Sequence, residues 1–252
     1  MAGLDGRGDL VSVDLFWIPL GAGGWFVKRN GRLYEAVVAL RDGRPRRDLY
    51  HSALEVVVPE GRFVIEQAPV PGPRSAPRGV VAEGSVGLRE AGRLRIFRYE
   101  VRRWRDGHIP DAAEAVESPR RLSTDDDVAH RLLRLVPEVP TPIWGRDELQ
   151  TGDMWNSNSV ISWLITRSGL DPDEVPLPRG GRAPGWDAGI AAARRDLVGS
   201  GRSASKPACP GSASSRTPRR PGRRPPRSGP ATARSSPRRR AGAGCAGRAR
   251  GP

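Results

Sequence analysis

The sequence predicts an α+β fold, formed by a single domain over about residues 10–197 and followed by a tail over residues 198–252. First, a group of short β-like runs precedes two strong helical patterns, which is typical of strands flanked by helices. Second, residues 1–196 carry 28 basic and 28 acidic side chains and all fourteen aromatic ones, as in a neutral body with one core. Third, residues 197–252 carry 14 basic side chains and no acidic one.

The first part of the body is rich in strand signals. Residues 11–20 are mostly apolar and end at a glycine-rich run, which predicts a strand and a loop. After the turn signal Asn30-Gly31, apolar residues at helical spacing predict a short helix over residues 33–40. The apolar runs 49–58 and 62–68 are separated by Pro59-Glu60-Gly61 and predict a β-hairpin. We expect further strands over residues 79–86 and 94–104.

Two helices are expected in the second part of the body. Ser123 is expected to cap a helix whose first turn holds three aspartates, a composition that the positive end of a helix favours, and Pro137 ends that helix. The next helix opens at Ser157 and continues through a run of apolar residues. Gly169 stands where a left-handed C-cap belongs.

The tail has a biased composition. Arg, Pro, Gly, Ser and Ala supply 49 of its residues after Asp196, and no aliphatic or aromatic core residue follows Val198. Such a segment cannot bury enough apolar surface to offset its ordering entropy, so we expect it to be disordered. Three interpretations remain: an arm that binds nucleic acid non-specifically through phosphate charge, an inert tail, and the product of a frameshift in GC-rich DNA.

Several function classes are excluded or disfavoured. Both cysteines, Cys209 and Cys245, lie in the tail, so the body has no disulfide, no thiolate zinc site and no cysteine nucleophile. No histidine pair has metal-ligand spacing with Asp or Glu, and we expect neither a metal nor another cofactor. Residues 11–27 are too interrupted to span a bilayer or to serve as a secretory signal, which predicts a cytoplasmic protein without a membrane span.

Two stretches carry residues that can do chemistry. The first places His51 at the head of the predicted strand 49–58, and the second places Asn156, Ser157 and Asn158 at the opening of a helix. The first turn of a helix offers unpaired N–H groups and the positive end of the dipole, which can stabilise an oxyanion. A histidine on a neighbouring strand can serve as the general base for a nucleophile placed there.

These two motifs resemble the circularly permuted papain-like fold. That group includes NlpC/P60-related permuted hydrolases, lecithin:retinol acyltransferase-like proteins and PPPDE desumoylating peptidases. The resemblance covers roughly residues 48–170 and implies a histidine that precedes the nucleophile, as His51 precedes Ser157. It implies that His51 is the base and Ser157 the nucleophile, with Glu66, or less well Gln67, orienting the imidazole.

The sequence departs from the family at the nucleophile, because serine stands where the family has cysteine. A serine hydroxyl is not ionised by a helix dipole, so its attack depends on proton removal by His51. One hypothesis is therefore a hydrolase or acyltransferase acting on an amide, ester or thioester. The N–H groups of Ser157 and Asn158 would hold the oxyanion, Asn156 would contact the oxyanion or the substrate, and Arg182 would contact an anionic substrate. The alternative is a catalytically inactive papain-like protein that binds a peptide, lipid or small molecule, in which Ser157 is a helix N-cap. A second alternative is a nucleic-acid-associated protein that acts through the tail.

A basic run over residues 93–105 interleaves arginines with Phe97, Tyr99 and Trp104. Basic residues with aromatic ones can bind single-stranded nucleic acid. Because Tyr99 and Val101 alternate with polar residues, we favour the interpretation that the run is a strand with one solvated face.

Overall fold

The computed structural model describes residues 11–20, 35–36, 38–41, 43–70 and 78–204, the last six of these by their backbone alone. The chain divides into two compact units, Met1–Pro207 and Ala208–Pro252, and the whole of the second lies outside the described residues. The tail predicted to be disordered begins at residue 198. Residues 198–204 are helical instead, and residues 205–252 lie outside the described ones.

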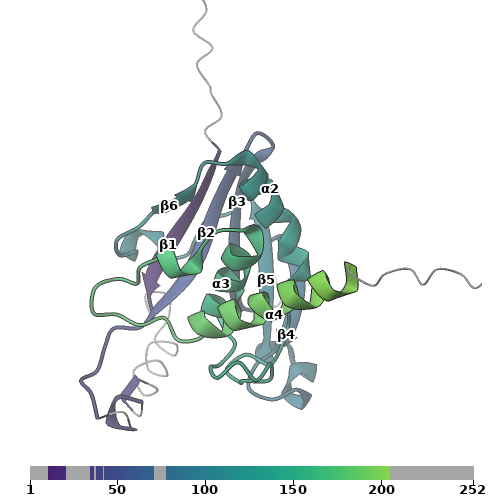
Figure 1. The fold of residues 1–252 in the computed structure, drawn as a ribbon. Coiled ribbons are helices and arrows are strands. Elements are labelled where there is room, and N and C mark those ends of the chain that lie inside the picture. Colours follow the sequence, from purple (N-terminus) through teal and green to yellow (C-terminus); the bar gives the residue numbers. More distant parts are fainter. Residues whose placement is uncertain (1–10, 21–34, 37, 42, 71–77, 205–252) are drawn as a thin grey trace, which may run out of the picture. The chain divides into compact units, whose positions relative to one another are not determined.

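The first unit contains a six-stranded antiparallel sheet with helices, which confirms the α+β class (Figure 1). Along the sheet the strand order is β4-β5-β3-β2-β1-β6. The strands are β1 (Ser12–Pro19), β2 (Tyr50–Val58), β3 (Gly61–Pro69), β4 (Val80–Ser85), β5 (Arg98–Arg105) and β6 (Arg120–Ser123). The α-helices are α2 (Asp126–Leu135), α3 (Ser157–Ser168) and α4 (Trp186–Ala204), and the short 3₁₀ turns are η1 (Glu90–Arg93), η2 (Arg95–Phe97), η3 (Ala112–Glu114), η4 (Val136–Glu138) and η5 (Pro172–Glu174).

The two faces of the sheet have different environments. The helix face packs against α2, α3 and α4 and buries the main core, to which the strands contribute Trp17, Leu54, Ile65 and Tyr99 (Figure 1). The far face carries a smaller apolar cluster made by Ile18, Ala53, Val64 and Ile109. Because side chains alternate along a strand, each residue of β2 is assigned to one face or the other.

Several expected elements are present, with shifted ends. Residues 50–58 and 61–69 form the expected hairpin, and Gly169 is the left-handed C-cap of α3, with φ at 93°. The helix expected over 33–40 is helical at residues 35–36 and 38–41, and its other residues lie outside the described ones. The strand expected over 94–104 begins only at Arg98, because residues 95–97 form a 3₁₀ turn.

Three helix assignments need correction. The N-cap of α2 is Asp125, whose side chain accepts a hydrogen bond from the N–H of Val128, whereas Ser123 ends strand β6. The N-cap of α3 is Asn156, which leaves Ser157 as the first helical residue. Helix α4 was not expected, and it continues to Ala204, seven residues beyond the predicted domain end at residue 197.

Candidate functional site

The polar residues that open α3 are engaged in capping the helix. The Asn156 side chain accepts a hydrogen bond from the Asn158 N–H at 2.9 Å, and Ser159 completes a capping box, its hydroxyl accepting from the Asn156 N–H at 3.0 Å. This arrangement satisfies N–H groups that a helix otherwise leaves unpaired. The Asn158 N–H is therefore not available to an oxyanion, contrary to the role expected for it.

The same residues also join α3 to β2 and to the segment before α4. The Asn158 side chain donates hydrogen bonds to the carbonyl oxygens of Tyr50 and Pro184, at 3.0 and 2.9 Å, and accepts one from the Ser52 hydroxyl at 2.9 Å. Asn156 also donates to the Pro184 carbonyl, at 2.8 Å. Both asparagines are buried, so these bonds satisfy groups that would otherwise be costly to bury. Their role is structural.

Ser157 is the one polar residue of the motif without such a role. The residue is only 6% exposed, and its hydroxyl makes no hydrogen bond within the described part of the chain. A serine can attack only when a base removes its proton, so its chemistry depends on whether His51 reaches it.

The geometry of β2 directs His51 away from α3. Ser52 is on the helix face, because its hydroxyl bonds to Asn158, and Tyr50 belongs to the core on that face. His51 lies between them in a continuous strand, opposite Ile18 of β1, and therefore faces the far side with the cluster around Ala53. The structure does not bring His51 and Ser157 together as a hydrogen-bonded pair.

The surroundings of His51 disfavour a charged imidazole. Burial of the ring lowers the pKa of His51 from 6.5 to about 4, and the nearby charge of Asp111 offsets only part of this effect. His51 is thus neutral at pH 7 and half-buried on the far face of the sheet.

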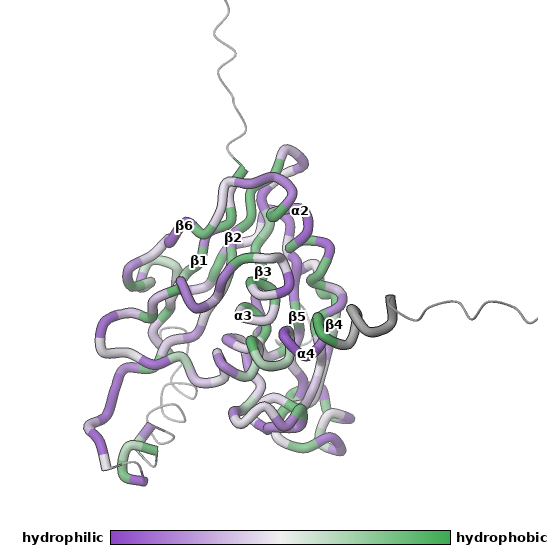
Figure 2. The backbone as a smooth tube through the Cα atoms, in the orientation of Figure 1, coloured by the Kyte–Doolittle hydropathy of each residue, from purple (hydrophilic) through white to green (hydrophobic). Residues whose placement is uncertain are grey.

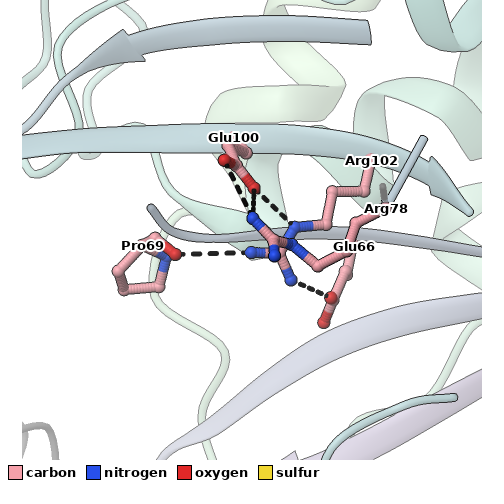
Figure 3. A network of polar contacts seen from close by, with 5 residues as sticks. All are labelled: Glu66, Pro69, Arg78, Glu100 and Arg102. Carbon is pink, nitrogen blue, oxygen red and sulfur yellow. Dashed lines mark hydrogen bonds and ion pairs between the residues drawn. The ribbon is translucent and has the colours of Figure 1, made fainter. Parts of the chain in front are cut away.

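Glu66 also has a structural partner instead of the histidine. Its carboxylate forms a buried ion pair with Arg102 of β5 at 2.6 Å, and Arg102 in turn contacts Glu100 at 2.9 Å (Figure 3). Arg78 joins the network through Glu100 at 3.1 Å, and Arg102 reaches the Pro69 carbonyl. Two carboxylates and two guanidinium groups balance their charges at this position. Glu66 is on the same face of the sheet as His51, but its carboxylate is hydrogen-bonded to Arg102 and to no histidine among the described residues.

The alternative third residue, Gln67, faces the opposite side of the sheet. It pairs with Val101, which belongs to the core of the helix face, and it is 4% exposed. Neither atom of its side-chain amide has a hydrogen-bond partner among the described residues. Because His51 faces the far side, Gln67 cannot orient it either.

Arg182 holds a carboxylate of the protein itself. Its guanidinium contacts Glu35 at 3.3 Å, and Glu35 is buried and also bonded to Arg44 at 2.6 Å and to the N–H of Arg47 at 2.8 Å. The hydrogen bond from Arg44 is the main reason that the pKa of Glu35 is lowered. Arg182 therefore anchors the segment around residue 35 and is not directed to an anionic substrate.

A second candidate site is an arginine-lined pocket of about 390 Å³ beside β4. Arg89, Arg93 and Arg98 line it together with Glu83, Gly84, Ser85 and Gly92. Arg89 is paired with Glu148, and Arg98 with Glu83 at 3.2 Å, whereas Arg93 makes no ion pair with any described residue. Guanidinium groups of this kind recognise phosphate and carboxylate.

Sequence reasoning missed the turn between Arg93 and Arg98 of this pocket because it assigned residues 94–97 to a strand. The available signal was the sequence Leu94-Arg95-Ile96-Phe97, in which adjacent apolar residues break the strict alternation of a half-buried strand.

Neither metal ligation nor membrane crossing finds support in the described residues. They contain no group of three or more His, Cys, Asp or Glu side chains that could hold a metal ion. None of their helices combines the length and the apolar composition needed to cross a bilayer.

Comparison of the chain with protein-family models, with curated proteins and with solved structures gave no match. The papain-like assignment therefore stays a prediction from the sequence motifs.

Proposed function

We propose that this chain is a binding protein for an anionic ligand, and that its papain-like motif serves the fold rather than a Ser–His hydrolase. The observation that carries this proposal is the hydrogen bond from Ser52 to Asn158, which fixes the face of β2 that meets α3. His51 then lies on the other face, and Ser157 lacks its expected base.

Two further requirements of hydrolysis are not met, which supports a structural role of the motif. A tetrahedral intermediate needs preorganised donors, yet the Asn158 N–H is used by the N-cap of the same helix. A histidine whose pKa is about 4 is a weak base near neutral pH, wherever it stands. The side-chain N–H groups of Asn156 and Asn158 donate hydrogen bonds to backbone carbonyl oxygens.

The arginine-lined pocket supports the choice of an anionic ligand. Its lining contains three guanidinium groups and one carboxylate, and Arg93 is exposed and without an ion pair among the described residues. A phosphate or carboxylate group entering the pocket would complete that missing pair through charge-assisted hydrogen bonds.

Two measurements test this proposal. We expect a fluorophosphonate probe to leave the wild-type chain unlabelled, because Ser157 has no base. We expect inorganic phosphate to bind in a calorimetric titration and Arg93→Gln to weaken that binding, while Arg134→Gln, an exposed arginine on α2, serves as the matched control. Labelling that disappears in Ser157→Ala would favour the hydrolase, and phosphate binding that is unaffected by Arg93→Gln would contradict the pocket.

A further inference from the structure

We propose that residues 88–98, here called the β4–β5 tip, are a docking surface for a membrane that contains anionic lipid. The tip belongs to the connection between the antiparallel strands β4 and β5 and includes the two short turns η1 and η2. This inference rests on the proposed function, since it identifies the anionic group that meets Arg93 as a lipid phosphate.

The tip exposes an unusual amount of apolar surface. Leu88, Leu94, Ile96 and Phe97 are 57, 61, 76 and 40% exposed. They are four of the nine large apolar side chains that are exposed among the described residues, and they lie within ten positions of one another. Single exposed apolar residues need no explanation, but four that lie so close along the chain indicate an interaction surface.

The backbone of the tip holds these side chains outward. The Leu94 N–H donates to the Ala91 carbonyl at 2.9 Å, and the Phe97 N–H donates to the Leu94 carbonyl at 2.9 Å. The Val86 N–H then closes the connection by donating to the Phe97 carbonyl at 2.8 Å. Because the turns are closed by their own hydrogen bonds, the apolar side chains between them cannot fold back into the core without breaking these bonds.

Charge accompanies the apolar side chains. The tip contains four arginines and one glutamate: Arg89, Arg93, Arg95, Arg98 and Glu90. Arg93 and Arg95 are exposed and make no ion pair with the described part of the chain. In Figure 2 hydrophobic and hydrophilic residues occur side by side in this connection. Apolar groups that enter a bilayer interface beside arginines that meet phosphates are the pattern of a peripheral membrane contact.

The chemistry of the tip favours lipid over other polyanions. A single-stranded nucleic acid is held by aromatic faces on which bases stack, whereas the most exposed residues here, Ile96 and Leu94, are aliphatic. Aliphatic side chains are matched by acyl chains, and unpaired arginines are attracted by the negative surface potential of an anionic leaflet. The contact would be peripheral, because no described helix could cross the bilayer.

The test is sedimentation of the full chain with phosphatidylcholine vesicles, with and without phosphatidylglycerol. We expect binding only when phosphatidylglycerol is present. The double variant Leu94→Ser and Ile96→Ser keeps every charge, the basic tail included, and should weaken binding by about tenfold for each removed side chain. Leu40→Ser, an exposed leucine outside the tip, is the matched control and should bind like the wild type.

The arginines are tested in the same assay. Arg93→Gln with Arg95→Gln should weaken binding by about fivefold for each lost charge, and Arg134→Gln should leave it unchanged. Wild-type binding by the Leu94→Ser and Ile96→Ser variant, or no vesicle binding at all, would overturn the inference. If free phosphate still binds in either case, the proposed function survives and only the lipid assignment fails. If the chain captured an acidic protein but bound no vesicles, the partner of the tip would be a protein, and the membrane assignment would be wrong.

Discussion

A half-buried, uncharged His51 makes the stability of the protein depend on pH in a defined direction. Its pKa is lowered from 6.5 to about 4, mainly by burial. The unfolded chain therefore binds more protons than the folded chain between these two values. The free energy of unfolding should fall as the pH drops through this window. At roughly 1.4 kcal/mol for each pKa unit, the loss attributable to His51 is about 3 kcal/mol at pH 4.

Urea denaturation of the wild type and of His51→Gln, at pH 7 and at pH 4, measures this loss. Glutamine cannot be protonated, so the difference between the two pH values should be about 3 kcal/mol smaller in the variant. His130→Gln is the control with the opposite sign. A hydrogen bond to the Asp126 carbonyl, with Glu60 nearby, raises the pKa of His130, whose contribution is fully present below pH 6.5 and lost as the pH rises through the raised value.

The refuting result is specific to the location of His51. If the wild type and His51→Gln lose the same stability on acidification, the imidazole is not buried in its neutral form. A titration of the ring by NMR that gives a pKa at or above 6.5 would point to the same conclusion, because a carboxylate or open solvent would then face His51.

Three further predictions address the fold and the tail. Arg102→Gln leaves Glu66 and Glu100 buried without their shared partner, and we expect it to lower the free energy of unfolding by about 3–5 kcal/mol in urea denaturation, whereas a change within about 0.5 kcal/mol would contradict the network. Gly189→Ala places a methyl group 2.1 Å from the Ser159 carbonyl oxygen, and we expect a loss of about 1–3 kcal/mol by the same measurement; a stabilised variant would show that α3 and α4 are not in close contact. Deletion of residues 205–252 should abolish any sequence-independent, salt-sensitive binding of DNA in a mobility-shift assay, and retained binding would move that activity to the body.

The elements that sequence reasoning identified correctly are those with local signals. The hairpin was predicted from Pro59-Glu60-Gly61 between two apolar runs, and the end of α3 was predicted from Gly169. Helix α4 was missed because its sequence is rich in alanine and glycine and has a weak apolar face. The turn at residues 95–97 was missed because the alternation of polar and apolar residues over 98–102 was extended back to residue 94, although Ile96 and Phe97 are adjacent apolar residues.

The site could not be assembled from motifs, because a motif does not specify the face of a strand. The relevant signal lies elsewhere in β2. Leu54 and Val56 share the alternation of Ser52 and belong to the core of the helix face, whereas Glu55 shares the alternation of His51. Because His51 shares a face of the strand with Glu55, the pattern predicts that His51 faces away from the main core. Which face the helices cover is a tertiary property, and only the structure supplied it.

The most direct test of the account is the acidity of a thiol placed at position 157. In the full chain with Cys209→Ser and Cys245→Ser, Ser157→Cys introduces the only thiol, and its pKa can be followed by thiolate absorbance. The helix dipole lowers that pKa from the ~8.5 of a free thiol and burial of position 157 raises it, and His51→Ala in the same background should leave the pKa unchanged. A pKa that rises when His51 is replaced would show that the imidazolium and the thiolate meet. In that case the papain-like pair exists, and our assignment of His51 to the far face of the sheet is wrong.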